Sequence, residues 1–91
     1  MEFEWDENKR ISNLVKHRID FIDATLVFRD PRRLNNRDTT KDYGETRINT
    51  IGELKDGVIV AVIHTDRQGV IRIISARRAS RKERKLYYGN R

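Results

Sequence analysis

Eight basic residues and a single acidic one occupy the last twenty-one positions of the chain, from Ile71 to Arg91. Eight positive charges minus one negative charge give this segment +7, whereas the whole chain carries +6. Such a local concentration of cations is typical of a surface that binds a polyanion, with nucleic acid as the first candidate. The basic residues are Arg72, Arg77, Arg78, Arg81, Lys82, Arg84, Lys85 and Arg91.

The pattern in this segment predicts a strand over residues 70–76 that is followed by a basic helix. Projected at about 100° per residue, the helix has a narrow apolar edge, Ala79 with Leu86, that is expected to face a sheet. Its broad basic face consists of Arg77, Arg81, Arg84 and Tyr88. The helix either continues directly from the strand at Arg77, or it begins at Ser80 with Glu83 completing a capping box.

Two further arginines, Arg67 and Arg72, are candidates for the same surface. Arg72 interrupts an apolar strand, and a lone buried guanidinium is costly. It is therefore expected to face an open surface or to pair with a carboxylate. Arg67 belongs to the preceding turn, and if the strand ends lie near the helix, both arginines converge with Arg77 and Arg81 on phosphate groups. Taken singly, Arg67 is more simply a surface residue that favours solubility.

The chain has two histidines and no cysteine. His17 ends a predicted helix, where its charged form suits the helix dipole, so we assign it a structural role. His64 ends a predicted strand beside the Arg67 turn. One interpretation is a general acid or base, since His titrates near neutrality. The other is a purely structural histidine that caps the end of the strand. Two isolated histidines without paired carboxylates do not make a metal site, so no metal is expected.

Two amphipathic helices are predicted before the sheet. Asp6 caps a helix over residues 7–17. Its buried stripe is expected to be Ile11, Leu14 and Val15, which have helical i, i+3, i+4 spacing. Asp20 caps a second, short helix that ends before Pro31, because the residue preceding a proline disfavours the helical conformation.

From Thr46 onward the pattern is that of strands. Residues 46–54, Val58–Ile63 and 70–76 predict three antiparallel strands that form a meander, the first two joined by an Asp-Gly hairpin turn. Val58–Ile63 is an unbroken apolar run, which favours a central strand. Residues 38–45 are expected to form an exposed loop.

We therefore expect an α+β fold in a single domain over residues 1–91. It has a small antiparallel sheet, a three-stranded meander plus short edge strands, with two helices before it and one basic helix after it. The absence of cysteine fits a reducing cytosol, and no apolar run approaches the roughly 20 residues of a membrane span. A cytoplasmic protein without a membrane partner is expected. The sequence pI of about 10.1 favours nucleic acid, although an acidic protein partner would satisfy it as well.

Three stretches together resemble the BrnT family of bacterial toxins, in the right order and over nearly the whole chain. They are W-D-x-x-K-x-x-x-N-x-x-K-H (Trp5 to His17), V-F-x-D-P (Val27 to Pro31) and I-S-A-R-x-A-x-x-x-E-R-x-x-Y (Ile74 to Tyr87). One position departs from the family pattern, since Arg18 stands where a glycine usually ends the first helix. A residue with a Cβ resists the left-handed conformation, so this helix end is expected to be built differently.

The resemblance implies a RelE-like fold and a toxin of a type II toxin–antitoxin pair. Such a toxin cleaves RNA without a metal or other cofactor and inhibits translation and growth. It is neutralised by a BrnA-like antitoxin with a ribbon-helix-helix domain, through which the complex binds operator DNA and represses its own operon. Toxins of this fold orient RNA with Arg and Lys and promote attack by a ribose 2′-OH on the adjacent phosphate.

The candidate residues fit that chemistry, because fixed guanidiniums stabilise the negative charge that develops on a phosphate under attack. Arg77 and Arg81 are expected to do so, and Lys82 or His64 to shuttle protons. The predicted RNA-binding residues are Arg67, Arg72, Arg84, Tyr87 and Tyr88, the tyrosines by stacking on bases. The alternative function is a non-enzymatic nucleic-acid-binding module or co-repressor subunit that only sequesters its antitoxin.

Overall fold

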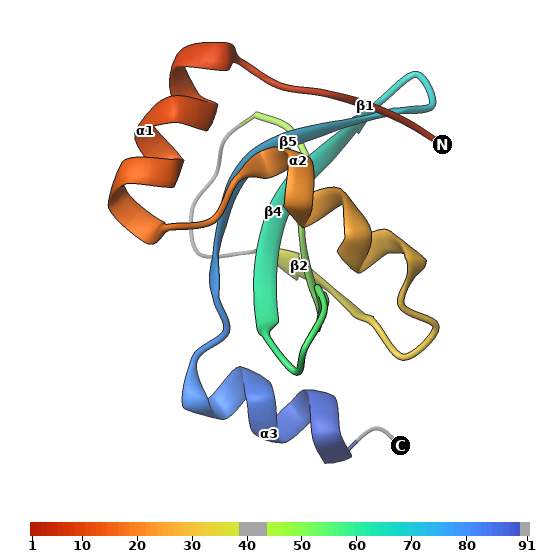
Figure 1. The fold of residues 1–91 in the computed structure, drawn as a ribbon. Coiled ribbons are helices and arrows are strands. Elements are labelled where there is room, and N and C mark those ends of the chain that lie inside the picture. Colours follow the sequence, from red (N-terminus) through yellow and green to blue (C-terminus); the bar gives the residue numbers. More distant parts are fainter. Residues whose placement is uncertain (39–43, 90–91) are drawn as a thin grey trace.

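The computed structural model describes residues 1–38 and 44–89 and shows a mixed five-stranded sheet with helices packed against it (Figure 1). The strand order is β1-β5-β4-β3-β2. The elements are β1 (Glu2–Glu4), α1 (Glu7–His17), α2 (Phe21–Ala24), the 3₁₀ helix η1 (Thr25–Arg29), β2 (Leu34–Asp38), β3 (Arg47–Glu53), β4 (Ile59–Arg67), β5 (Val70–Arg78) and α3 (Arg81–Gly89). The predicted α+β class is confirmed, with helices before the sheet and a basic helix after it.

The sheet is mixed, so the prediction of an antiparallel sheet is wrong at one edge. Strands β2 to β5 pair antiparallel in sequence order, whereas β1 lies parallel to β5, with Phe3 opposite Ile71. Both tight hairpin turns contain two successive residues with positive φ, the geometry that matches the twist of paired strands. These are Asp56 with Gly57, as predicted, and Gln68 with Gly69. Most of the predicted loop over residues 38–45, and Arg91, lie outside the described residues.

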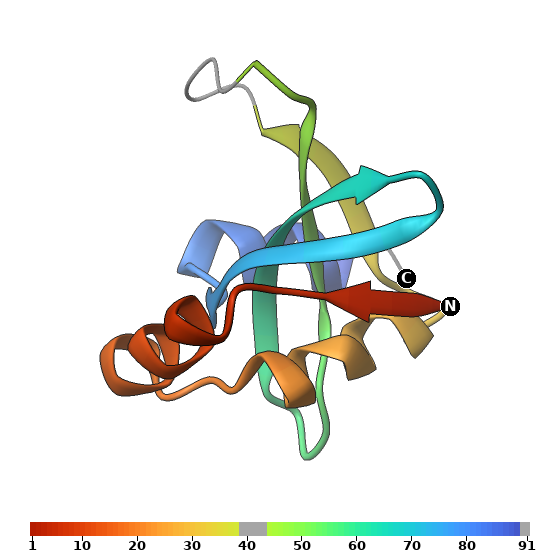
Figure 2. The ribbon, with the colours of Figure 1, turned by 90° about the horizontal axis from the view of Figure 1, so that it is seen from above.

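Two separate hydrophobic clusters lie on opposite faces of the sheet, because side chains alternate along a strand. We call the face covered by α2 and η1 the closed face; its cluster includes Val60 and Val62 of β4. The open face carries α3, and its cluster includes Ile59 and Ala61 of the same strand. Figure 2 shows α1, α2 and η1 together along one side of the sheet.

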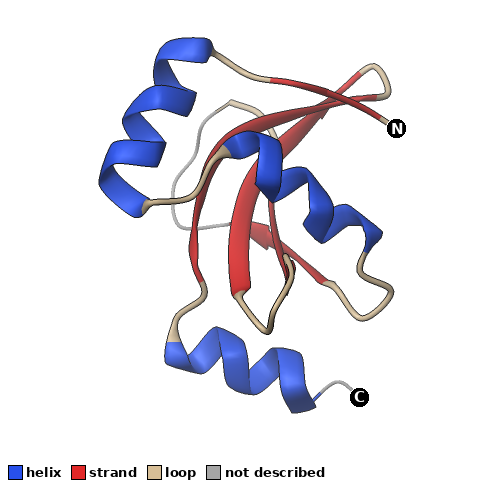
Figure 3. Cartoon of the chain, viewed as in Figure 1, coloured by secondary structure: helices blue, strands red, loops and turns tan. Residues whose placement is uncertain are grey.

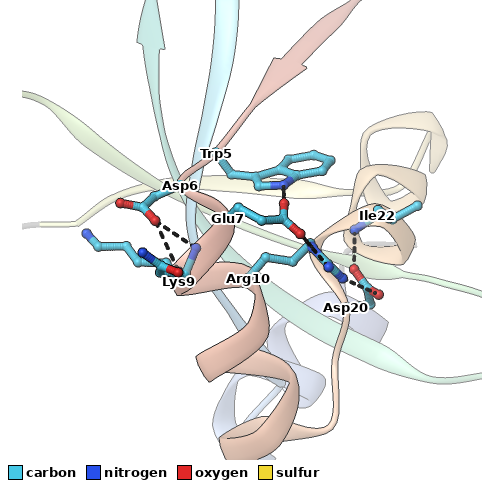
Figure 4. Close-up of polar contacts among 8 residues, drawn as sticks. Trp5, Asp6, Glu7, Lys9, Arg10, Asp20 and Ile22 are labelled. Carbon is cyan, nitrogen blue, oxygen red and sulfur yellow. Dashed lines mark hydrogen bonds and ion pairs between the residues drawn. The ribbon is translucent and has the colours of Figure 1, made fainter.

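The predicted caps of the first two helices are confirmed (Figure 4). The Asp6 carboxylate accepts from the N–H groups of Asn8 and Lys9 at 2.8 and 3.3 Å, and Asp20 accepts from Ile22 at 2.9 Å. Arg10 joins the two helices, because its guanidinium binds both Glu7 and Asp20. No helix among the described residues is long and apolar enough to cross a membrane.

Helix α1 packs against the sheet through a polar residue, so its predicted buried stripe is wrong. Ile11 and Val15 are 50 and 74 % exposed, whereas Asn13 is buried. The Asn13 amide donates to Ile19 O and Ala76 O at 2.9 and 2.8 Å, and its oxygen accepts from Ala76 N–H at 3.2 Å. Because β1 pairs only as far as Arg72, the edge of β5 is left without a strand at Ala76, and Asn13 occupies that place.

Helix α1 ends in the left-handed conformation that is usual for a glycine. The prediction that Arg18 would make this helix end differ from the family pattern is therefore wrong. Arg18 adopts the left-handed conformation with φ 61°, and its N–H donates to Leu14 O at 2.9 Å. A side chain with a Cβ is strained there by roughly 1 kcal/mol relative to glycine. The bond to Leu14 satisfies one of the last carbonyl groups of the helix.

Candidate nucleic-acid interface

Helix α3 begins at the later of the two predicted starts. Strand β5 continues to Arg78, and a short loop separates it from α3 (Figure 3). Glu83 N–H donates to Ser80 Oγ at 3.1 Å, and Ser80 N–H donates to Glu83 Oε1 at 2.8 Å, which is a capping box. Arg77 therefore lies on a strand, and the helical projection that grouped it with Arg81 and Arg84 is wrong.

Tyr87, rather than Leu86, anchors α3 to the open face. Tyr87 is 2 % exposed and packs in the cluster of Ile51 and Ala61, whereas Leu86 is 51 % exposed. The projection failed because it was oriented on Ala79, which precedes the helix. A ring in this position is part of the core and is not available to stack on an RNA base. Tyr88 is 44 % exposed and keeps its candidacy as a stacking residue.

Asp30 joins α3 to the corner between η1 and β2. It accepts from Tyr87 Oη at 2.6 Å, from Glu53 N–H at 2.9 Å and from Arg32 N–H at 2.9 Å. Burial raises the pKa of Asp30, but these hydrogen bonds outweigh it and leave the pKa below its ordinary value. Gly52 permits this close approach, because a Cβ there would lie 2.8 Å from Val27 Cγ1. Sequence analysis identified the Asp-Pro turn but not its bond to Tyr87.

A polar cleft of about 400 Å³ lies on the open face, and it contains Arg77. Strands β2 to β5 and α3 all contribute to its lining, which includes Asn36, Asn49, Ile63, Arg77 and Glu83. Arg77 Nη1 and Nη2 donate to the two carboxylate oxygens of Glu83 at 2.7 and 3.1 Å. Asn49 Nδ2 donates to Glu83 Oε2 at 3.0 Å. One carboxylate thus ties together β3, β5 and the start of α3.

The cleft contains an ion pair that persists at ordinary pH. The hydrogen bond from Arg77, with further bonds from Ser80 N–H and Asn49, lowers the pKa of Glu83 to about 2. The same bond raises the pKa of Arg77. A carboxylate with so low a pKa is a weak base at pH 7. Glu83 and Asn49 were absent from the predicted site, although Glu83 is the one acidic residue of the C-terminal segment.

The remaining cations of α3 lie on the surface beside this ion pair. Arg81 and Lys82, in the first turn, and Lys85 are exposed. Arg84 is exposed too, and its Nη1 donates to Ala79 O at 2.9 Å, which holds the side chain against the start of the helix. This cluster of exposed cations flanks Glu83 along α3, and Glu83 in turn forms the ion pair with Arg77 in the cleft.

Arg72 and Arg67 pair with carboxylates at the far end of the hairpin. Arg72 Nη1 lies 3.5 Å from Glu4 Oε2, which is one of the two outcomes expected for it. Arg67 Nη2 lies 3.3 Å from Glu45 Oε1, and its side chain is 53 % exposed. Neither arginine makes a contact with Arg77 or Arg81 among the described residues, so the structure does not bring the four together.

His64 lies on the closed face, opposite Arg77. It is 6 % exposed, its ring is 4.9 Å from that of Phe28, and its Nε2 lies 2.7 Å from Thr50 Oγ1. The Thr50 hydroxyl donates to Asn35 Oδ1 at 2.7 Å, so it must accept from His64, and Nε2 carries the ring proton. Burial lowers the pKa of His64 to about 4. A neutral imidazole inside the core is not placed to shuttle protons for Arg77.

Comparisons with known proteins point in one direction. Residues 5–83 match the family model described as the ribonuclease toxin, BrnT, of type II toxin–antitoxin systems. The crystal structure of the Brucella abortus ribonuclease toxin BrnT is similar, with 32% sequence identity and a TM-score of 0.65. The similarity covers 89% of this chain and 99% of that one. A comparison with curated proteins finds no match.

Proposed function

Because the chain belongs to the BrnT family of ribonuclease toxins of type II toxin–antitoxin systems, we propose that it cuts RNA on its open face. The observation that carries this assignment is the position of Arg77, a guanidinium fixed at a polar cleft next to the exposed cations of α3. Family membership supplies the RNA target and the antitoxin partner in general terms. The residues, the mechanism and the identity of the partner are part of the proposal.

The reaction proposed is attack by a ribose 2′-OH on the adjacent phosphate, with no metal ion. Negative charge develops on the phosphate and on the 5′ leaving oxygen, and cations that are already in place stabilise it without reorganisation. Arg77, at the cleft, and Arg81, in the first turn of α3, supply this stabilisation. The attacking 2′-OH gives its proton to solvent water as the bond between phosphorus and the 5′ oxygen breaks. Lys82, exposed beside Arg81, delivers a proton to that 5′ oxygen and regains one from water. Arg84 and Tyr88 bind the RNA on either side of the phosphate under attack.

The biological consequence proposed is arrest of translation and growth until a BrnA-like antitoxin with a ribbon-helix-helix domain covers the toxin. An acidic segment of that antitoxin would neutralise the same cations on α3 that bind RNA, because both partners are polyanions. The complex would then bind operator DNA through the antitoxin and repress its own operon. The domain extends over residues 1–91, and the RelE-like character of the fold remains a prediction.

The test is cleavage of messenger RNA by the purified protein in the presence of a metal chelator. The wild type is compared with the double variant Arg77→Ala, Arg81→Ala, and both are shown to be folded by thermal unfolding. We expect discrete RNA products from the wild type and a loss of about three orders of magnitude in rate for the double variant. Equal rates would rule out the open face as the active site.

The alternative, a non-enzymatic nucleic-acid-binding subunit, is favoured by one observation. Two candidates for a general base, His64 and Glu83, are both unsuitable, since His64 is buried with a pKa of about 4 and Glu83 has a pKa of about 2. This alternative predicts RNA binding that weakens steeply with salt, with no new RNA ends. Mapping RNA ends in the cleavage experiment distinguishes the two functions.

A further inference from the structure

The ion pair between Arg77 and Glu83 uses only one edge of the guanidinium. Glu83 accepts one hydrogen bond from Nη1 and one from Nη2. A guanidinium has five N–H donors, and the weak contact from Nη1 to Arg78 O, at 3.4 Å, uses a third. Among the described residues, nothing accepts from Nε or from the second hydrogen of Nη2. These two donors form the other bidentate edge of the side chain, the geometry that suits a phosphate.

Glu83 is itself held from three directions. Its carboxylate accepts from Ser80 N–H and from Asn49 Nδ2 in addition to Arg77, and its own N–H donates to Ser80 Oγ. The Glu83 side chain is 14 % exposed, whereas that of Arg77 is 40 % exposed. The fixed partner is thus the carboxylate, and the guanidinium extends from it toward solvent. This is the arrangement by which one side chain orients another.

Two other roles for Glu83 fit these contacts less well. A general base needs a pKa near the working pH, and that of Glu83 is about 2. An internal competitor would lose only its two bonds to Arg77. Its bonds to Asn49 and Ser80 N–H would keep the carboxylate next to the incoming phosphate, which it would repel. A phosphate that approaches the Nε edge displaces nothing.

We propose that Glu83 is the positioning residue of the site: it holds one edge of the Arg77 guanidinium and turns the other edge toward a phosphate of the RNA. This inference rests on the proposed function, because it assigns Glu83 a part in the reaction of Arg77. Glu83 does not touch the substrate. Its effect is on the rate of the chemical step, because a pre-oriented guanidinium stabilises the developing charge without first losing rotational freedom.

The test variant is Glu83→Gln, which keeps an acceptor for the capping box but removes the charge. We expect kcat to fall by about 10- to 100-fold, as for other residues that orient a working group. Affinity for a single-stranded 2′-O-methyl RNA, which lacks the attacking hydroxyl, should be unchanged or up to about fivefold tighter, since a negative charge near the phosphate is removed. A purely structural role would lower the unfolding temperature and leave kcat per folded molecule unchanged.

Two comparisons control for the fold. Ser80→Ala removes one half of the capping box but leaves the carboxylate bonds of Glu83, so it should lower the unfolding temperature and preserve kcat. Asn49→Ala releases Glu83 from β3 without touching the cap, and we expect a fall in kcat of about threefold. It provides the same readout if Glu83→Gln does not fold.

The effect of Glu83 must also pass through Arg77. In an Arg77→Ala background, Glu83→Gln should cause no further loss, because the group that it orients is gone. The inference is overturned if Glu83→Gln leaves kcat unchanged, raises it, weakens RNA binding in parallel with kcat, or slows the Arg77→Ala variant as much as the wild type. A wild type that does not cut RNA overturns the proposed function and this role with it. A wild type that cuts, slowed by Arg77→Ala but not by Glu83→Gln or Asn49→Ala, overturns this role alone.

Discussion

The two faces of the sheet place polar chemistry in opposite environments. On the closed face, His64 is buried against Phe28 under η1, and burial keeps it neutral. On the open face, Arg77 extends from its carboxylate partner toward solvent beside the exposed cations of α3. His64 lies on β4 and Arg77 on β5, and both were candidates for catalysis. The two residues differ in the cover above their face of the sheet. Burial under η1 keeps His64 neutral, whereas Arg77 on the open face is partly exposed and charged.

The largest expected effect tests this contrast by activity. Arg77→Ala should lower kcat/KM for RNA cleavage by about 100- to 1,000-fold, roughly 3 to 4 kcal/mol of transition-state stabilisation. His64→Gln, which keeps a donor for Thr50, should stay within about threefold of the wild type. The measurement is the initial rate on one RNA at several substrate concentrations. A His64→Gln variant as slow as Arg77→Ala would place catalysis on the closed face.

A second effect concerns the hydrogen bonds of Asn13, which attach α1 to the edge of β5. Asn13→Ala leaves the N–H and carbonyl of Ala76 and the carbonyl of Ile19 without partners, so it should lower the free energy of unfolding by about 2 to 4 kcal/mol. Val15→Ser, on the exposed side of the same helix, should change it by less than about 0.5 kcal/mol. Urea unfolding of both variants measures the difference. If Val15→Ser were the more harmful change, α1 would be packed through its apolar stripe after all.

A third effect separates the two faces by pH. The pKa of His64 is lowered to about 4, so between pH 6.5 and 4 the unfolded chain binds a proton that the folded chain does not, and stability falls as pH falls. This loss should be on the order of 2 kcal/mol and should be absent in His64→Gln. Glu83, with its pKa lowered to about 2, contributes stability that is lost only below about pH 4.5. Urea unfolding at pH 7, 5.5 and 4 measures the first window, and a flat profile for the wild type would contradict the burial of a neutral His64.

The smallest expected effect concerns the anchor of α3 on the open face. Tyr87→Phe removes the hydroxyl that donates to Asp30 and should lower the free energy of unfolding by about 1 kcal/mol. Leu86→Ser, at the neighbouring exposed position, should have almost no effect. Thermal unfolding of the two variants provides the measurement. The reverse order would mean that α3 faces the sheet through Leu86, as the helical projection predicted.

Local chemistry in the sequence predicted much of the fold. Asp6 and Asp20 cap helices, Asp56 with Gly57 makes a hairpin turn, and Ser80 with Glu83 makes a capping box. Each of these interactions joins residues that are a few positions apart, so a short stretch of sequence is enough to predict it. The same proximity explains why the existence of the helices and central strands was predicted.

Helix orientation could not be predicted in the same way, because it depends on distant partners. Asn13 bonds to Ala76, 63 positions away, and Tyr87 bonds to Asp30, 57 positions away. In both helices a polar group makes the tertiary contact, and the apolar spacing therefore indicated the wrong side. The site was the hardest part to predict for this reason. Arg77, Asn49 and Glu83 come from three elements, and the pairing of β3 with β4 and of β4 with β5 is needed to bring Asn49 near Arg77.

The central claim is that RNA is bound on the open face and not on the closed one. NMR titration of the ¹⁵N-labelled protein with a 2′-O-methyl RNA, which the protein cannot cut by 2′-OH attack, tests it most directly. We predict shifts in the backbone resonances of Asn49, Arg77 and the first turn of α3, with His64 and α1 unperturbed. Shifts confined to the surface of α1 and α2, with α3 unchanged, would contradict the account.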